Sequence, residues 1–230
     1  VILPLLGFLI ACTLSFFKSN AFIDRLAEII TCTFIVLAAF FSFYIFIENI
    51  GNPSVVSLKL FTWIESGSFS ADWSIYLDSV TSVMLVVITS VSALVHVYSI
   101  GYMSHDDSKP RFMGYLSLFT FAMIMLVTAD NFLQLFFGWE GVGLASYLLI
   151  GFWYKKPTAN AAAIKAFIVN RVGDFGLALG IFTIFIVFGS IEYENVFNSA
   201  AKFSDAQFAF IGYEIHALTL ICIFLFIGAM

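Results

Sequence analysis

Long runs of apolar residues divide this sequence, and each complete run approaches the ~20 residues that a helix needs to cross a bilayer. Because lipid offers no partners to backbone N–H and C=O groups, we expect every run to be helical. The sequence therefore predicts an all-α, polytopic transmembrane bundle of about seven spans. They are Val1–Phe17, Ile29–Ile47, Ser79–Tyr98, Phe112–Thr128, Phe132–Trp153, Ala163–Phe188 and a run from Ala217 that is still apolar at Met230.

The composition excludes a soluble globular domain. Hydrophobic residues make up 61% of the sequence and charged residues only 11%, as is typical of polytopic membrane proteins. The first run lacks a basic n-region and an A-x-A-like cleavage site, so we expect a span and not a signal peptide. The sequence begins with Val1 and reaches Met230 inside an apolar run, and we therefore expect it to be a fragment of a longer protein.

The basic residues predict how the spans are oriented. Most of them fall in connections that lie on one side of the membrane, and only Lys59 and Lys202 fall on the other. The positive-inside rule then places the N-terminus outside and directs the fifth span from outside to inside. The residues on the inner side are Lys18, Arg25, Lys109, Arg111, Lys155, Lys156 and Lys165.

Two outer connections have patterns of their own. Residues 48–78 alternate loosely between apolar and polar residues and turn at Ser66-Gly67-Ser68, which predicts a short exposed hairpin. The connection before the last run has weak helical character around Val196–Phe203. Both connections are acidic, and we expect solvated connectors rather than funnels that attract ions. The second contains Glu192, Glu194, Asp205 and Glu214.

Glu140 is the strongest candidate for a functional residue, because it is the only charged residue between Asn131 and Trp153. Burying a carboxylate at that depth costs several kcal/mol, so such residues usually face a bundle interior or a water path. Two unit charges at about 4 Å interact by ~4 kcal/mol at an effective dielectric of about 20. A cationic partner that approaches and retreats could therefore unload and load a proton. The alternative is a protonated carboxyl that only binds a neighbouring helix.

Arg171 and Asp174 are three residues apart in the sixth span, a spacing that places both on one face of a helix. They are predicted to form either a structural ion pair or a polar relay that links Glu140 to inner water. Glycines accompany both charged sites and allow a second helix or water to come close. They are Gly138, Gly141 and Gly143 around Glu140, and Gly176 and Gly180 after Asp174.

His96 and Lys165 are weaker candidates at the inner ends of their spans. His96 is either a neutral packed imidazole or a proton relay, since its unperturbed pKa lies near neutrality. Lys165 either extends its amine to the interface or continues the relay inward. Cys12, Cys32 and Cys222 lie in separate apolar runs and are expected to be inert thiols.

Several site classes have no motif in the sequence. It contains no Walker A loop, dinucleotide fingerprint, CxxC cluster or histidine pair at haem spacing within a span. Basic patches interleaved with aromatic residues, as nucleic-acid binding requires, are missing too. We expect this chain to bind no metal, no cofactor and no nucleic acid.

Three segments together resemble a known family. They are residues 78–106, residues 111–154 with the block GWEGVGLASYLLIGFW, and residues 165–181 with NRVGDFGLALGI. This sequence resembles chain 5 of NADH:ubiquinone oxidoreductase, respiratory complex I, from about Trp73 to Gly189. The resemblance implies the start of an antiporter-like subunit of the membrane arm, with inverted five-helix repeats and a broken seventh helix.

The resemblance also implies roles for individual residues. Glu140 matches the family's fifth-helix glutamate, which pairs with a lysine on the seventh helix. In the family that lysine follows in a Gly-Lys sequence, which would come after Met230. Arg171 and Asp174 match a charged pair on the sixth helix, and His96 lies where the third helix often has a polar residue.

The function implied is that of a proton-translocating subunit of complex I, in which Glu140 carries protons. NADH oxidation and quinone reduction, with NADH, FMN, Fe–S clusters and ubiquinone, belong to other subunits. The expected partners are other membrane-arm subunits and the lipid bilayer. The alternatives are a stand-alone cation/proton antiporter subunit and a structural membrane-arm subunit without a proton path.

The resemblance and the composition also suggest a location and a division of the chain. The 29 phenylalanines suggest an AT-rich genome, which favours the mitochondrial inner membrane over a bacterial plasma membrane. The expected divisions are 1–61 for the first two helices and the outer loop, 62–112 for the chain 5 N-terminal antiporter-like region, and 130–230 for the proton-translocating core, which is expected to be incomplete at its C-terminus.

Overall fold

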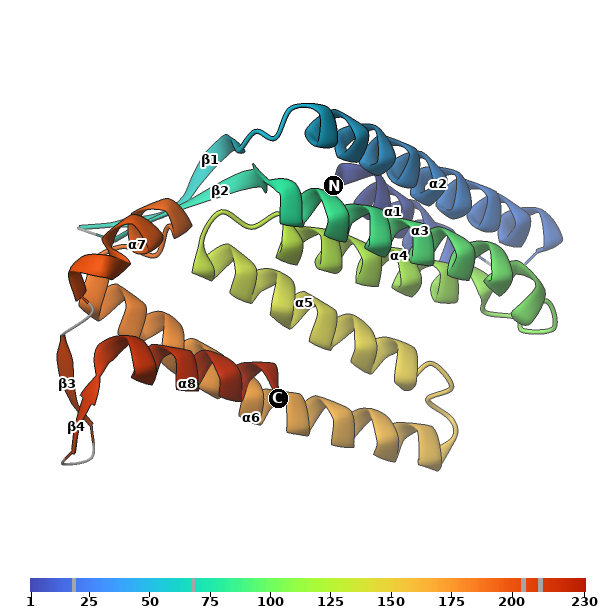
Figure 1. The fold of residues 1–230 in the computed structure, drawn as a ribbon. Coiled ribbons are helices and arrows are strands. Elements are labelled where there is room, and N and C mark those ends of the chain that lie inside the picture. The colour runs from blue at the N-terminus through green and yellow to red at the C-terminus, as the bar shows by residue number, and fades with distance from the viewer. Residues whose placement is uncertain (18–19, 68, 204–205, 211–212) are drawn as a thin grey trace.

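The computed structural model describes residues 1–17, 20–67, 69–203, 206–210 and 213–230. Among them, helices predominate, and two short hairpins join them (Figure 1). The elements in chain order are α1 Ile2–Ser15, α2 Ala21–Gly51, β1 Val56–Ser66, β2 Phe69–Leu77, α3 Ser79–Tyr102, α4 Lys109–Val127, α5 Phe132–Ile150, α6 Pro157–Phe188, α7 Tyr193–Ala200, the 3-10 turn Ala201–Phe203, β3 Gln207–Phe210, β4 Tyr213–His216 and α8 Ala217–Ala229.

An apolar helix occupies each predicted span, which confirms a mostly helical membrane bundle. In the described residues, five helices are long and apolar enough to cross a bilayer, namely α2, α3, α4, α5 and α6. The apolar helices α1 and α8 are shorter, with 14 and 13 residues. At 1.5 Å per residue, neither covers the ~30 Å hydrocarbon core by itself.

The prediction of an all-α fold is wrong in detail, because the chain also forms two antiparallel hairpins. The first pairs β1 with β2 from Val56↔Leu77 to Ser66↔Phe69, where the alternating pattern predicts a hairpin. Gly67 has φ 60°, which an L side chain rarely adopts; Ser68 of the predicted turn lies outside the described residues. The second hairpin, β3–β4, was not predicted, because its two strands have only four residues each.

The ends of the helices follow local capping rules. The side chains of Asp78 and Asn131 accept hydrogen bonds from the backbone N–H of Thr81 and Gln134, at 2.7 and 2.8 Å, and so cap α3 and α5. At the other end of α6, Gly189 adopts φ 68°, the left-handed conformation that commonly ends a helix. The helical character predicted around Val196–Phe203 is present in α7 and the 3-10 turn.

The two ends of the bundle differ in structure. The connections α1–α2, α3–α4 and α5–α6 lie at one end, which we call the basic end, while both hairpins and α7 lie at the opposite end, the hairpin end (Figure 1). Arg25, Lys109, Arg111, Lys155 and Lys156 belong to the basic end. Two residues used in the sequence patterns, Lys18 and Asp205, lie outside the described residues. The orientation in the membrane stays a prediction.

Candidate functional site

The structure brings Glu140 of α5 together with Arg171 and Asp174 of α6. Arg171 Nη1 donates a hydrogen bond to Glu140 Oε2 and forms an ion pair with it. The same Nη1 lies 3.4 Å from Asp174 Oδ2 on the next turn of its own helix. One guanidinium thus bridges two carboxylates on two helices, and we call this group the charged triad.

The members of the triad differ in exposure. The side chain of Asp174 is 10% exposed, that of Glu140 23% and that of Arg171 43%. Arg171 also stacks over the ring of Phe167, with its Cζ atom 4.6 Å from the ring centroid. This contact holds the cation on the side of α6 that faces Glu140.

A further residue, Trp139, fixes Asp174 from the opposite helix. Its indole Nε1 donates a hydrogen bond to Asp174 Oδ1 at 2.8 Å. The two oxygens of Asp174 therefore have separate partners, Trp139 on α5 and Arg171 on α6. Trp139 was not predicted from the sequence, because its acceptor lies 35 residues away on another helix. The one available signal is that an indole N–H within a membrane span usually needs an acceptor.

Glycines set the distances between the helices around the triad. A Cβ atom on Gly138 would lie 2.6 Å from the backbone of Leu126, so α4 and α5 touch at this point. A Cβ atom on Gly176 would lie 2.6 Å from Ile227, and one on Gly180 would lie 2.8 Å from Leu225, both in α8. The predicted Gly176–Gly180 motif therefore packs against α8. Gly143, in contrast, has open space beside it.

That open space belongs to a cavity of about 780 Å³ between α4, α5, α6 and α8. Asp174 and Trp139 line it together with Ser146 and Asn170. Most of its lining is apolar, and water molecules in a cavity of this size would bind at these few polar side chains. Of the triad, Asp174 is the member that lines the cavity.

His96 lies outside this site, in a separate cluster between α3 and α4. Its ring is 1% exposed. Nδ1 lies 2.8 Å from the Ser92 carbonyl oxygen and therefore donates to it, and Nε2 lies 3.2 Å from Ser117 Oγ. The Ser92 hydroxyl in turn lies 2.5 Å from Thr120 Oγ1. Both ring nitrogens thus have partners on the two helices, which is how a packed, satisfied imidazole is held.

Lys165 also lies apart from the triad. It is exposed on α6, six residues before Arg171, which corresponds to about 9 Å along the helix axis at 1.5 Å per residue. Its position fits an amine that extends toward the basic end of the bundle.

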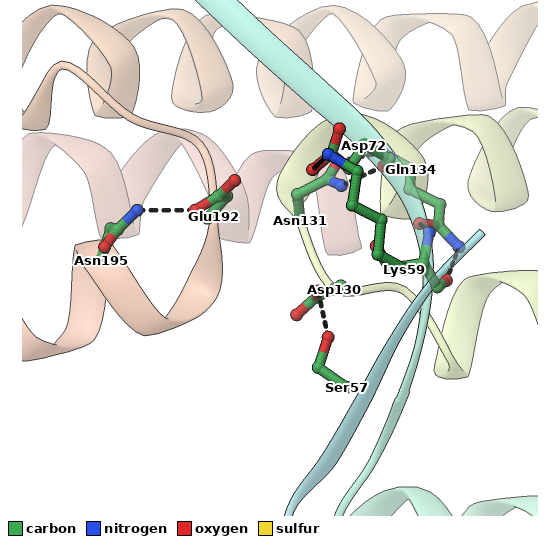
Figure 2. A network of polar contacts seen from close by, with 9 residues as sticks. Ser57, Lys59, Asp72, Asp130, Asn131, Gln134, Glu192 and Asn195 are labelled. Atoms are coloured by element: carbon green, nitrogen blue, oxygen red, sulfur yellow. Dashed lines mark hydrogen bonds and ion pairs between the residues drawn. The ribbon is translucent and has the colours of Figure 1, made fainter. Parts of the chain in front are cut away.

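A polar network at the hairpin end was not predicted from the sequence (Figure 2). Gln134, fully buried at the start of α5, binds both backbone groups of Ser74 in β2, at 3.0 and 2.7 Å. Asn131 donates to the Asp72 carbonyl oxygen at 2.7 Å, and Asp130 accepts from the Ser57 hydroxyl at 2.7 Å. The network therefore ties the first hairpin to the beginning of α5.

Two carboxyl groups in this network have shifted pKa values of opposite sign. A hydrogen bond from Lys59, which lies 2.5 Å from Asp72 Oδ2, lowers the pKa of Asp72. Burial, and then the nearby charges of Asp72 and Asp130, raise the pKa of Glu192. Glu192 accepts a hydrogen bond from Asn195 at 2.6 Å.

Within the described residues, no group of three or more His, Cys, Asp and Glu side chains is placed to hold a metal ion. The three cysteines are free and belong to three different helices.

Two family models match the sequence. One, described as NADH-Ubiquinone oxidoreductase (complex I), chain 5 N-terminus, matches residues 63–113. The other, described as NADH:quinone oxidoreductase/Mrp antiporter, TM, matches residues 129–230 and so contains the whole charged triad.

Two solved structures share the fold. The Mrp complex from Dietzia sp. DQ12-45-1b superposes with a TM-score of 0.72 at 18% identity, covering 98% of this chain and 23% of that chain. The membrane-bound sulfane sulfur reductase, an archaeal respiratory membrane complex, superposes with a TM-score of 0.75 at 15% identity, covering 97% of this chain and 42% of that chain. The helices therefore adopt an antiporter-like fold.

Curated relatives are much more similar in sequence. NADH-quinone oxidoreductase subunit L of Rickettsia bellii is 53% identical over 206 residues, which are 90% of this chain and 32% of that protein. NADH-ubiquinone oxidoreductase chain 5 of Chondrus crispus is 51% identical over 228 residues, which are 99% of this chain and 34% of that protein. The chain spans about a third of the length of these relatives, and it belongs to the family of NADH:quinone oxidoreductase chain 5 and subunit L proteins.

Proposed function

We propose that this chain contributes a proton-translocating site to an NADH:quinone oxidoreductase, with the charged triad as the group that takes up and releases the proton. The observation that carries the proposal is the bridge that Arg171 makes between Glu140 on α5 and Asp174 on α6. With both carboxylates ionised, the triad has a net charge of −1, and with one protonated it is neutral. The triad can therefore store one proton.

The proton would be moved by changing the charge around the triad. A cation that approaches within about 4 Å favours an ionised carboxylate by ~4 kcal/mol at an effective dielectric of about 20, and its withdrawal favours proton uptake. The family resemblance implies a lysine on the seventh helix for this role. Ile227 and Gly228 of α8 line the same cavity as Asp174, so a cation borne on that helix would meet Asp174 first.

The energy for transport would come from other subunits. Moving one charge across 100 mV costs about 2.3 kcal/mol, and the chain itself is proposed to hold no redox centre. NADH oxidation and quinone reduction, with FMN, Fe–S clusters and ubiquinone, would take place in other subunits of the complex. Other membrane-arm subunits and the bilayer are the proposed partners.

The number of spans, the divisions of the chain and its location are also proposals. We infer that α1 and α8 lie in the membrane with the five longer helices, which gives about seven spans. We also retain the divisions 1–61, 62–112 and 130–230. The mitochondrial inner membrane is the proposed location, with a bacterial plasma membrane as the alternative. The high phenylalanine content supports the first, and similarity to a Rickettsia protein supports the second.

A stand-alone cation/proton antiporter subunit is the nearest alternative function. The likeness to the Mrp complex supports it, but at 18% identity that likeness concerns the fold. Relatives named as oxidoreductase subunits are 49–53% identical and favour the first proposal. Co-purification of the full-length protein with NADH-oxidising subunits would distinguish the two.

The experiment that tests the proposed function uses the complete enzyme in proteoliposomes. With Glu140→Gln, we expect NADH-driven proton translocation to fall at least about tenfold, equivalent to ~1.4 kcal/mol. The matched control is Glu194→Gln, which removes an exposed carboxylate from α7 and should pump at the wild-type rate. A Glu140→Gln enzyme that assembles normally and pumps at the full rate would support a structural subunit instead.

A further inference from the structure

A second site lies at the basic end of the bundle. Arg111, near the start of α4, lines a cavity of about 420 Å³ between α4, α5 and α6. Within the described part of the chain, no carboxylate lines this cavity, whereas a smaller cavity that Arg111 also lines, of about 190 Å³, contains Asp24 and Asp107. The other polar and aromatic side chains around the larger cavity are Tyr115, Tyr147, Phe152, Tyr154 and Asn160.

The Arg111 guanidinium retains capacity for a ligand. Its Nη2 donates to the Phe152 carbonyl oxygen at 3.2 Å, and its Cζ lies 4.6 and 5.3 Å from the ring centroids of Phe152 and Tyr154. Its Nε is buried without a hydrogen-bond partner in the described residues, and none of their ion pairs includes Arg111. The planar guanidinium presents several N–H donors in a fixed geometry. Without a carboxylate partner, these donors are suited to bind phosphate oxygens.

Residues next to the cavity add positive charge and an aromatic side chain of the kind that is common at membrane interfaces. Lys155 and Lys156 are exposed in the connection that follows the cavity wall. The Lys156 amine lies 4.9 Å from the centroid of the Trp153 ring, and Trp153 Nε1 donates to Asp106 Oδ2 at 2.9 Å. Basic pockets between helices at the membrane surface, rimmed by Trp and Tyr, are typical of anionic lipid headgroup sites.

The face of α6 next to the cavity changes from polar to apolar. Asn160 and Ile164 line the cavity, and Ile168 follows on the same face, because residues four apart on a helix are neighbours. Ile164 and Ile168 are 51% and 58% exposed. A headgroup at Arg111 would thus have an acyl-chain path along Ile164 and Ile168, which a free phosphate ion would not use.

We propose that the 420 Å³ cavity binds the phosphate headgroup of an anionic phospholipid. Arg111 binds the phosphate oxygens, and one acyl chain lies along Ile164 and Ile168. The lipid would fill the space between the basic ends of α4, α5 and α6 and hold these ends together. The proposal does not depend on proton translocation by the triad.

The test uses the complete enzyme in vesicles that contain a photoactivatable phosphatidylglycerol, with the reactive group on an acyl chain. In the wild-type enzyme, illumination should label α6 near Ile164 and Ile168, as mapped by peptide mass spectrometry. Arg111→Gln should reduce this labelling about fivefold or more, through loss of a charge-assisted phosphate contact. The matched control, Arg25→Gln, removes an exposed cation of α2 at the same end of the bundle and should leave the labelling unchanged.

Two further labelling experiments identify the ligand. A photoactivatable phosphatidylcholine should label α6 much less, and excess inorganic phosphate should not displace the phosphatidylglycerol. Equal labelling by both lipids, displacement by inorganic phosphate, or full labelling of Arg111→Gln would each overturn the proposal. If Arg111→Gln does not assemble, Ile164→Trp serves in its place. It fills the mouth of the cavity from an exposed position, so wild-type labelling of that enzyme would likewise contradict the site.

Discussion

Two polar clusters lie within the helices, and they differ in charge, in partners and in access to open space. The charged triad joins α5 and α6 through one guanidinium and two carboxylates, beside a cavity of about 780 Å³. The His96 cluster joins α3 and α4 through hydroxyls, a carbonyl oxygen and an imidazole that is 1% exposed. A cavity of about 360 Å³ touches Ser92 and Thr120, but its other lining residues are apolar and His96 is not among them.

This difference separates a group that can change its charge from one that holds two helices together. In the triad, a change of charge on one carboxylate alters the interaction of the other with Arg171, because both carboxylates pair with the same guanidinium. In the His96 cluster, the donors and acceptors are already matched, so a charged imidazole would lose its acceptor role at Nε2. We therefore expect the triad to dominate proton transfer and the His96 cluster to dominate stability.

The largest effect on pumping is expected from removing the shared cation. Arg171→Gln leaves Glu140 and Asp174 without their common partner, and proton translocation by the complete enzyme should fall at least about tenfold, or ~1.4 kcal/mol. Adding Glu140→Gln to this variant should reduce proton translocation little further, because the effects of residues that act as a unit are not additive. Independent, multiplying losses in proteoliposome assays would break the comparison by showing that the triad is not one unit.

A smaller effect is expected from the residue that positions Asp174. Trp139→Phe keeps the aromatic ring but removes the N–H that binds Asp174 Oδ1. Because Arg171 still pairs with Asp174, proton translocation should fall by less than the tenfold expected for Arg171→Gln. The pH dependence of the pumping rate should shift, while a merely structural role would leave that profile in place. Trp153→Phe is the control, since Trp153 binds Asp106 at the basic end.

His96→Gln is expected to leave pumping almost unchanged and to reduce stability. The substitution disturbs buried hydrogen bonds to Ser92 and Ser117, which costs about 1–3 kcal/mol when a partner is left unsatisfied. Thermal unfolding of the purified enzyme and pumping at a permissive temperature measure the two effects separately. A strong loss of pumping with normal unfolding would make His96 part of the proton path and remove the contrast between the clusters.

The smallest effects concern the hairpin end and have opposite signs. The pKa of Asp72 is lowered by Lys59, so its contribution to stability is present above its unfolded pKa, near 4, and is lost as the pH falls through the lowered value. The pKa of Glu192 is raised by burial, so its ionisation destabilises the fold once the pH rises past its unfolded pKa, and falling pH relieves this cost. Hydrogen exchange of β2 amides should become faster in Asp72→Asn at neutral pH and unchanged or slower in Glu192→Gln. Faster exchange in both variants would contradict these signs.

The apolar runs predicted the helices because the bilayer requires internally bonded backbone, and the i, i+3 spacing predicted that Arg171 could reach Asp174. The sequence could not show that Arg171 also reaches Glu140, since that contact depends on how α5 and α6 pack. It also could not show that Trp139 turns toward Asp174, or that Gln134 binds Ser74 across 60 residues. The role of His96 could not be predicted, because a lone histidine in an apolar run has the same sequence pattern whether it packs between two helices or relays protons.

The most direct test of the account is infrared difference spectroscopy of the complete enzyme during NADH-driven turnover. The account predicts a carboxyl C=O band that appears or disappears with turnover, that is lost in Glu140→Gln and that shifts in Arg171→Lys. A turnover spectrum identical in the wild-type and Glu140→Gln enzymes would show that Glu140 does not change protonation, and would contradict the central claim.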